Sequence, residues 1–290
     1  MTKNRNSRNK SRNKQGRRDQ NTEIASRGSS FQGEKGTQNQ LWLFGNHAVY
    51  AALINPERTC HRLLLTADAK TDAEAILAQA SENGLSRPGI EIVDRATINQ
   101  TLSEGSVHQG IAMMVAPLPS LALEDICQSL AEQSQALVVI IDQGTDPRNI
   151  GAVMRSASAF GAAAVIVQDR HAPEATGVLA KAASGALETL PLVRVTNLSR
   201  ALEQLNEVGF WSVGLAGDSD QTLDTLEWPD KTILVLGSEG KGMRRLVREN
   251  CDFITKIPMT EHMESLNLSN AAAIALYEIH RNNLSKKQSA

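Results

Sequence analysis

Short apolar runs alternate with segments of helical periodicity from Leu41 to the C-terminus. Between Leu41 and Pro117 the pattern predicts helices over NHAVYAALIN, DAEAILAQASENG and RATINQTLS, and strands over RLLLTA, IEIVD and GIAMMVAP. Asn46 is predicted to cap the first helix, which follows Gly45. These residues therefore predict a small α/β unit.

A second series of strands and helices begins at Ala136. Strands are predicted over ALVVIID, AAVIVQ, LPLVRV, FWSVGLAG, TILVLG and FITKIPM, and helices over NIGAVMRSASAFG, PEATGVLAKAASGAL, LSRALEQLNEVG, GMRRLVREN and NLSNAAAIALYEIHRNN. Strands that alternate with helices indicate a parallel sheet covered on both faces. Ligands of such sheets bind at the carboxyl ends of the strands.

The chain is predicted to divide into a basic tail (1–40), a first α/β domain (41–116), a linker (117–135), a second α/β domain (136–283) and a short C-terminal tail (284–290). The linker begins with two prolines and continues as an amphipathic helix. The basic tail holds ten Lys/Arg against three Asp/Glu and almost no apolar residue, which predicts disorder. Such a tail neutralises RNA phosphates in a salt-dependent way, or alternatively only solubilises the chain.

Composition narrows the classes of protein further. Cys60, Cys127 and Cys251 form no C-x-x-C pair and no metal spacing with the histidines, so we expect no metal and a reducing, cytoplasmic compartment. No apolar run approaches the roughly 20 residues that span a bilayer, and the basic N-terminus leads into no apolar signal segment. We therefore expect no membrane association.

The loop DQGTDPRNIGAVMRSA follows the strand ALVVII. Pro147 presets a turn, Asn149 is predicted to cap the following helix, and Gly151 allows that helix to pack closely. Arg155 lies on nearly the same helical stripe as Asn149, so both are predicted to face one pocket. The alternative is an ordinary capped helix with a surface arginine.

The loop GSEGKG follows the strand ILVL and raises the question of a phosphate site. A phosphate-binding loop of the Walker type requires Ser or Thr after its lysine, but Lys241 is followed by Gly242. Glu239 would also repel phosphate at short range. The loop therefore predicts close backbone approach to a neutral or cationic ligand, such as an adenosine without phosphates, or alternatively a glycine-rich turn with a solvated glutamate.

A third segment, ESLNLSNAAAIALYEI, places Ser265, Asn267, Ser269 and Asn270 before a helix with a small-residue face. Together DPRNIGAVMRSA, LGSEGKGM and IPM…SLNLSNAAAI resemble, in order and spacing, the three motifs of the SpoU/TrmH family of RNA ribose 2′-O-methyltransferases. FGNHAVYAAL and VHQGIAMMV are similar to the family's substrate-binding domain. The long basic tail and Asn270 depart from the family pattern.

The resemblance implies a C-terminal domain threaded into a trefoil knot around a parallel sheet, preceded by a small α/β RNA-binding domain of ribosomal-protein type. It also implies S-adenosyl-L-methionine as cofactor, no metal, and methyl transfer to a ribose 2′-hydroxyl, with a guanosine of 23S ribosomal RNA as the expected target. By family correspondence, Gly237, Ile257 and Leu266 contact the cofactor, and the catalytic positions fall on Asn149, Arg155, Glu239, Ser265 and Asn267.

The resemblance further implies a homodimer through the knotted domain and an RNA partner. Candidates for RNA contact in the first domain are Asn46, His47, Arg62, His108 and Gln109, each of which is otherwise a cap, turn or surface residue. Two alternatives stay open: the same reaction on transfer RNA or another ribosomal site, and an RNA-binding assembly factor without catalysis. An NTP-binding protein is disfavoured by Glu239 and by the missing Ser/Thr.

Overall fold

The apolar runs of the second series form one six-stranded parallel sheet in the computed structural model, which describes residues 40–170, 172–260, 262 and 265–289. The strands lie in the order β10-β8-β9-β5-β6-β7, and every neighbouring pair is parallel. They are β5 (Ala136–Ile141), β6 (Ala164–Gln168), β7 (Leu192–Val195), β8 (Trp211–Leu215), β9 (Lys231–Leu236) and β10 (Phe253–Thr255). The predicted parallel α/β architecture is confirmed.

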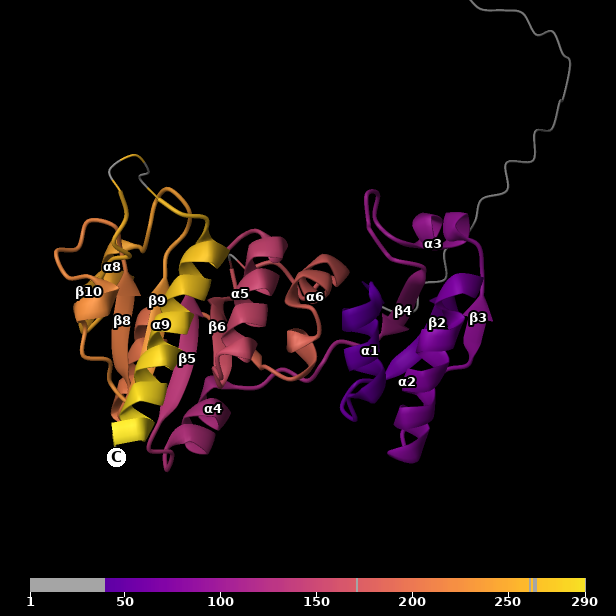
Figure 1. Ribbon diagram of the computed structural model, residues 1–290, viewed down its shortest axis with the longest axis horizontal. Coiled ribbons are helices and arrows are strands. Elements are labelled where there is room, and N and C mark those ends of the chain that lie inside the picture. Colours follow the sequence, from indigo (N-terminus) through magenta and orange to yellow (C-terminus); the bar gives the residue numbers. More distant parts are fainter. Residues whose placement is uncertain (1–39, 171, 261, 263–264, 290) are drawn as a thin grey trace, which may run out of the picture. The chain divides into compact units, whose positions relative to one another are not determined.

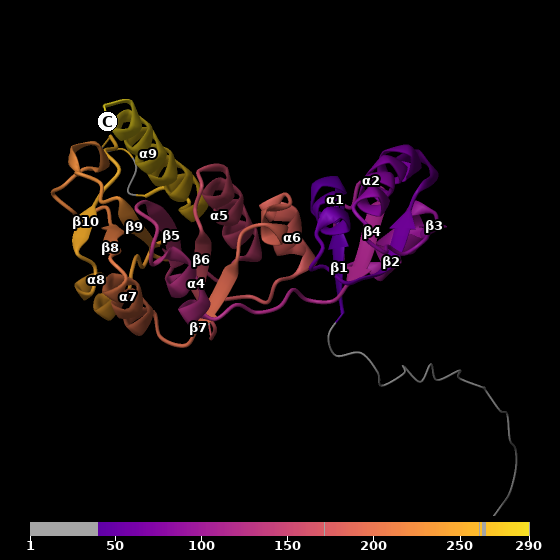
Figure 2. The ribbon, with the colours of Figure 1, turned by 90° about the horizontal axis from the view of Figure 1, so that it is seen from below.

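Helices cover both faces of this sheet, as Figure 2 shows: α5 and α9 lie on one face, and α4 and α7 on the other. Alternate residues of β5 divide between the two cores, with Val139 and Ile141 toward α5 and α9, and Val138 and Ile140 toward α4 and α7. The helices are α4 (Leu123–Leu130), α5 (Pro147–Ala159), α6 (Gly177–Ala183), η2 (Ala186–Glu188), α7 (Leu198–Glu207), η3 (Leu223–Thr225), α8 (Arg245–Glu249) and α9 (Leu268–Ser289).

The first series forms a mixed four-stranded sheet in the order β1-β4-β2-β3, of which Figure 1 labels β4, β2 and β3 side by side. Its elements are β1 (Leu41–Phe44), α1 (Asn46–Ile54), β2 (Cys60–Leu65), η1 (Ala67–Ala69), α2 (Lys70–Glu82), β3 (Ile90–Ile92), α3 (Arg95–Thr101) and β4 (Ile111–Val115). We call residues 41–116 the N-terminal lobe and residues 136–289 the C-terminal lobe. Both belong to one compact unit, residues 38–290.

The elements differ from the predicted ones at several places. Strand β1 was not predicted, and it pairs antiparallel with β4. Asn46 does not cap α1, because Gly45 stands at the cap position and Asn46 is the first helical residue. Helix α6 is shorter than predicted, since the Thr176 hydroxyl caps its start and Ser184 takes a left-handed conformation with φ 52° at its end. Helix α9 runs through the predicted C-terminal tail to Ser289.

Helix α6 of the C-terminal lobe packs closely on β1 of the N-terminal lobe. A Cβ atom on Gly177 would lie 2.2 Å from the Trp42 carbonyl oxygen and 2.8 Å from the Phe44 ring, so only glycine fits at this position. Val178 packs beside Phe44 in the small core that also contains Ile98 of α3. The two lobes therefore share buried apolar surface. Residues 1–39 of the predicted basic tail lie outside the described residues, and the trefoil knot stays a prediction.

Candidate active site

A cavity of about 330 Å³ opens at the carboxyl ends of β8 and β9, at the edge where ligands of parallel sheets bind. The three residues proposed for the cofactor, Gly237, Ile257 and Leu266, all line it. Glu239 and Ser265 lie on its wall as well. Its volume falls in the range of small-molecule sites, about 300–1,000 Å³. Leu215, Ala216, Gly217 and Met259 complete much of the lining and were not singled out from the sequence.

Gly237 can only be glycine in this structure. A Cβ atom there would lie 2.2 Å from the carbonyl carbon of Gly242 and 2.3 Å from the Met243 nitrogen. The loop folds back on itself because Ser238 and Gly242 exchange two backbone hydrogen bonds, of 3.0 and 2.9 Å. Gly242 has a φ of 66°, in the region that favours glycine. This closed loop lines the cavity, and its close approach to a bound ligand stays a prediction.

Glu239 accepts three hydrogen bonds at a single oxygen. Its Oε1 receives Asn267 Nδ2 at 2.7 Å, Asn149 Nδ2 at 2.9 Å and the Leu268 backbone nitrogen at 3.2 Å. Asn267 Nδ2 also lies 3.2 Å from Asn149 Oδ1. Residues 90 and 28 positions away along the chain thus meet at one carboxylate, and each of the three motifs contributes one side chain.

The Asn149 side chain is available for this contact because it does not cap its helix. The predicted cap at Asn149 is wrong: Asp146 stands at the cap position and accepts from the Arg148 nitrogen at 2.8 Å, with Pro147 as the first helical residue. The close packing predicted for Gly151 is confirmed, since a Cβ atom there would lie 2.5 Å from the Leu179 carbonyl oxygen. Tight packing of α5 on α6 therefore sets where Asn149 points.

Arg155 stands apart from this cluster. It is exposed on α5, does not line the cavity, and has no hydrogen bond or ion pair within the described residues. Asn149 does not line the cavity either, but it reaches Glu239, which does. The structure thus brings together Asn149, Glu239 and Asn267 and leaves the Arg155 guanidinium free to meet a partner from outside the chain.

An ion pair behind the loop was missed from the sequence. Asp142, fully buried directly after β5, accepts hydrogen bonds from the Arg244 backbone nitrogen and from its Nε, both at 2.8 Å, and its Oδ1 lies 2.7 Å from Arg244 Nη2. Asp142 thereby connects the first motif to the end of the glycine loop. A carboxylate directly after a buried apolar strand requires a partner, so the sequence could have identified Asp142 as a paired residue, though not Arg244 as its partner.

Among the RNA-contact candidates of the N-terminal lobe, His108 is buried, with 6 % of its surface exposed. Its Nδ1 accepts from the Gly110 nitrogen at 3.1 Å, so the proton lies on Nε2, which is 3.1 Å from Asn99 Oδ1. Both ring nitrogens are occupied, and His108 therefore orders its loop and does not face RNA. Arg62 is exposed and pairs with Glu91 at 2.7 Å. Asn46 and Gln109 pair with each other, the Asn46 nitrogen donating to Gln109 Oε1 at 3.3 Å.

Within the described residues, no helix is long and apolar enough to cross a membrane. The same part of the chain contains no group of three or more His, Cys, Asp or Glu that is arranged to hold a metal ion.

Two family models match the chain. The model described as the SpoU rRNA Methylase family matches residues 136–277, and the model described as RNA 2′-O ribose methyltransferase substrate binding matches residues 42–121. The 23S rRNA (guanosine-2′-O-)-methyltransferase RlmB of Pasteurella multocida is 40% identical over 244 residues, which cover 83% of this chain and 98% of that protein. The chain belongs to the SpoU rRNA methylase family.

Other members of the SpoU rRNA methylase family are similar over the same span. The RlmB protein of Haemophilus influenzae is 38% identical over 83% of this chain and 98% of its own length. The crystal structure of the SpoU methyltransferase AviRb from Streptomyces viridochromogenes, in complex with the cofactor AdoMet, superposes with a TM-score of 0.69 at 24% identity and covers 85% of this chain and 91% of that one. This likeness shows that the SpoU fold extends over both lobes.

Proposed function

We propose that this protein transfers a methyl group from S-adenosyl-L-methionine to the ribose 2′-hydroxyl of a guanosine in 23S ribosomal RNA. The observation that carries the proposal is the meeting of Asn149, Glu239 and Asn267 at the wall of the glycine-loop cavity. The RlmB relatives, similar over both lobes, support the reaction and the substrate. We also propose that the enzyme acts in the cytoplasm, where such a substrate would be met.

The cavity fits S-adenosylmethionine in its chemistry. Gly237 leaves backbone exposed for hydrogen bonds to an adenine edge, and Ile257 and Leu266 provide apolar surface for its faces. When bound, the cofactor supplies an electrophilic methyl group on a sulfonium. The Glu239 carboxylate on the cavity wall is electrostatically compatible with that positive charge and would disfavour a phosphate.

The residues of this chain have mainly to align the ribose oxygen and to handle one proton. Asn149 and Asn267 are held by Glu239, which orients their amide groups toward the site, and Ser265 stands on the cavity wall as a short polar contact for the nucleotide. These residues position the 2′-hydroxyl. Because they belong to three separate loops, the site forms only in the folded chain.

Arg155 binds the RNA phosphate next to the target ribose and stabilises the developing alkoxide. A guanidinium stays protonated in proteins and is a poor proton acceptor, so we assign it no role as a base. Its exposed position without a partner among the described residues suits an electrostatic contact with an incoming backbone. The hydroxyl proton leaves through that phosphate or through water.

Arg155→Ala tests this assignment. We expect methyl transfer to a 23S rRNA transcript to fall at least about 100-fold, the effect typical of removing one transition-state donor, while calorimetric affinity for S-adenosylhomocysteine stays within about threefold. Arg200→Ala, on α7 at the opposite face of the sheet, is the control and should retain activity. An equal loss of cofactor affinity in Arg155→Ala would make Arg155 structural.

Two alternatives are separated by direct measurements. Mapping 2′-O-methyl positions in RNA from cells with and without the protein distinguishes 23S rRNA from transfer RNA or another ribosomal site. Titration with S-adenosylhomocysteine distinguishes an enzyme from an assembly factor without catalysis, which would not bind it. The match of residues 42–121 to a substrate-binding model supports an RNA substrate, and the RlmB relatives favour 23S rRNA among the possible RNAs.

We also propose a homodimer through the C-terminal lobe. Ile274, Tyr277 and Leu284 are exposed on α9 by 41%, 56% and 47%, at helical spacing along one face. An exposed apolar stripe of this kind marks a protein interface. Ile274→Glu should halve the mass measured by light scattering, whereas Leu246→Glu, at an exposed apolar position on α8, should not. If light scattering gives the mass of a monomer for the unchanged protein, the proposed dimer is wrong.

The basic tail, residues 1–40, is proposed to contact RNA phosphates. Its deletion should weaken RNA binding and reduce the slope of the logarithm of affinity against the logarithm of salt concentration. An unchanged slope would leave the tail a solubilising segment.

A further inference from the structure

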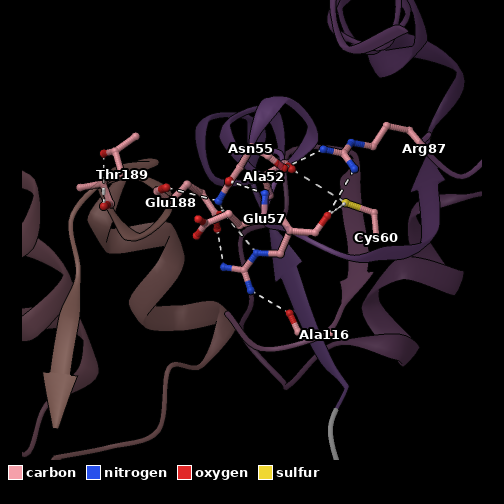
Figure 3. Close-up of polar contacts among 10 residues, drawn as sticks. Ala52, Asn55, Glu57, Cys60, Arg87, Ala116, Glu188 and Thr189 are labelled. Carbon is pink, nitrogen blue, oxygen red and sulfur yellow. Dashed lines mark hydrogen bonds and ion pairs between the residues drawn. The ribbon is translucent and has the colours of Figure 1, made fainter. Parts of the chain in front are cut away.

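Arg58 of the N-terminal lobe and Glu188 of the C-terminal lobe form a bidentate ion pair. Arg58 Nη2 lies 2.6 Å from Glu188 Oε1, and Arg58 Nε lies 3.0 Å from Glu188 Oε2. Figure 3 shows Glu188 directed at the turn that follows α1, beside Asn55. Asn55 Nδ2 donates to Glu188 Oε2 at 2.9 Å and completes the shell of donors around the carboxylate.

Among the ion pairs of the described residues, this is the pair in which both side chains are buried, whereas in Arg244–Asp142 only the aspartate is. Its side chains are 1% and 2% exposed, whereas Arg62–Glu91 is 49% and 44% exposed and Arg95–Asp68 62% and 68%. A buried charge without its partner is strongly unfavourable, while an exposed pair contributes little. Separating the lobes would therefore have to hydrate both charges at once.

Arg58 also holds Ala116, the last residue of the N-terminal lobe before the connection between the lobes. Arg58 Nη1 donates to the carbonyl oxygen of Ala116, the residue before Pro117, at 2.8 Å. Figure 3 labels Ala116 and marks this contact. Arg87 supports the turn from the other side by donating to the carbonyl oxygens of Leu53 and Asn55, at 2.6 and 2.7 Å. Residues 117–122 that follow are without helix or strand and mostly exposed. Lobes joined by such a segment are expected to move relative to one another unless an interface holds them.

Glu188 is connected to the candidate active site by packing alone. It ends η2, which follows α6, and α6 packs on α5 through the contact at Gly151 described above. Helix α5 carries Asn149 and Arg155. A rigid path of packed elements therefore runs from the Arg58 turn to the residues proposed to align the ribose.

We propose that the Arg58–Glu188 pair is a positioning device, which locks the RNA-binding lobe against α6 and η2 so that bound RNA presents its target ribose to Asn149 and Glu239. This inference rests on the proposed function. Neither residue touches the reacting atoms, so both are positioning residues. Their loss should affect how productively the RNA is held, measured as KM, more than the methyl transfer step or cofactor binding.

The test uses the full chain with Arg58→Met, the double variant Arg58→Met/Glu188→Leu, and Arg95→Met as the control for an exposed pair of the same lobe. The single variant leaves the buried Glu188 carboxylate without its partner. The double variant replaces both members of the pair by apolar side chains, a change that is often tolerated. Two readouts are taken: the rate of thermolysin cleavage before Leu121, followed by mass spectrometry, and kcat and KM on a 23S rRNA transcript.

In Arg58→Met we expect linker cleavage and KM to rise about tenfold, the equivalent of 1.4 kcal/mol, with kcat and S-adenosylhomocysteine affinity within about twofold. The double variant should return both quantities to within about twofold of the unchanged chain, and Arg95→Met should change neither. Should Arg58→Met not fold, Glu188→Gln carries the same test, with smaller rises in both quantities because it keeps the shape and one acceptor.

Linker cleavage and KM that stay at the values of the unchanged chain would overturn the inference. So would a double variant that folds but keeps the raised KM. A purely stabilising role would lower the melting temperature and the fraction of active enzyme without raising KM. If the unchanged chain does not methylate RNA, the proposed function fails, and the cleavage rates still report whether the pair holds the lobes together.

Discussion

The side-chain amide of Asn267 joins Glu239 to the start of α9. Its Nδ2 lies 2.7 Å from Glu239 Oε1, while its Oδ1 accepts from the Ser269 nitrogen at 2.9 Å and from the Ser269 hydroxyl at 2.6 Å. The amide orientation is thereby fixed, because only the nitrogen can face the carboxylate. One side chain thus holds both the glycine loop and the helix that follows the third motif.

Asn267→Asp should weaken the contact between the glycine loop and the start of α9, since it places a second carboxylate against Glu239 Oε1. We expect a loss of about 1–3 kcal/mol in the free energy of unfolding at pH 7, measured by urea denaturation. Asn270→Asp, an exposed change one turn further on, should cost nothing, and an equal cost there would contradict the assignment.

Asp142→Asn should weaken the contacts that hold Arg244 at the end of the glycine loop. The buried carboxylate accepts from both the backbone and the guanidinium of Arg244, and the amide offers only one acceptor oxygen. We expect the free energy of unfolding to fall by about 1–3 kcal/mol, as for hydrogen bonds to charged groups. Asp218→Asn breaks an exposed pair with Arg248 and should change it by less than about 1 kcal/mol. Equal effects would contradict a special role for Asp142.

Gly177→Ala should disturb the contact between α6 and β1. Its added methyl group would overlap the Trp42 carbonyl oxygen, which belongs to backbone and cannot rotate away. Overpacking of this kind costs about 1–3 kcal/mol, which thermal denaturation will register as a lower melting temperature. Gly89→Ala is the matched control, because a Cβ atom there meets nothing within 4 Å. Gly177→Ala with an unchanged melting temperature would exclude the close approach.

His108 should make the stability of the chain depend on pH. Burial lowers the pKa of His108 below its ordinary value of 6.5, and the positive charges of Arg95 and Lys181 lower it further. The unfolded chain therefore binds the proton more readily than the folded one, so stability is complete above pH 6.5 and is lost as the pH falls through that value. Melting temperatures between pH 8 and 5 should fall less steeply in His108→Gln than in the unchanged chain, and an equal fall in both would contradict this role of His108.

The strands of the parallel sheet could be predicted because each is buried on both faces and reads as an apolar run, as ALVVII does for β5. Strand β1 was missed because LWLF is four residues long and gains its place only by pairing with β4, more than 60 residues later. The ends of α6 depend on a threonine cap and a left-handed serine, which residue periodicity does not detect.

Residue types at the candidate site were predictable from three loops, but their contacts were not. Asn149 reads as a helix cap in the sequence, and only the fold shows that Asp146 takes that place and leaves Asn149 to Glu239. The partners of Asp142 and Glu188 lie 102 and 130 residues away, and no local pattern connects them. Such pairs are set by tertiary packing alone.

The distance along the chain between Arg58 and Glu188 also bears on how the protein is made. Strands β1 to β4 all lie within residues 41–115, so the N-terminal lobe can complete its sheet while the rest of the chain is still being synthesised. Arg58 nevertheless lacks its partner carboxylate until a further 130 residues, up to Glu188, have been synthesised. Until then the apolar surface of Trp42 and Phe44 that will receive α6 is open to solvent, and the nascent chain carries the Arg58 charge without its partner.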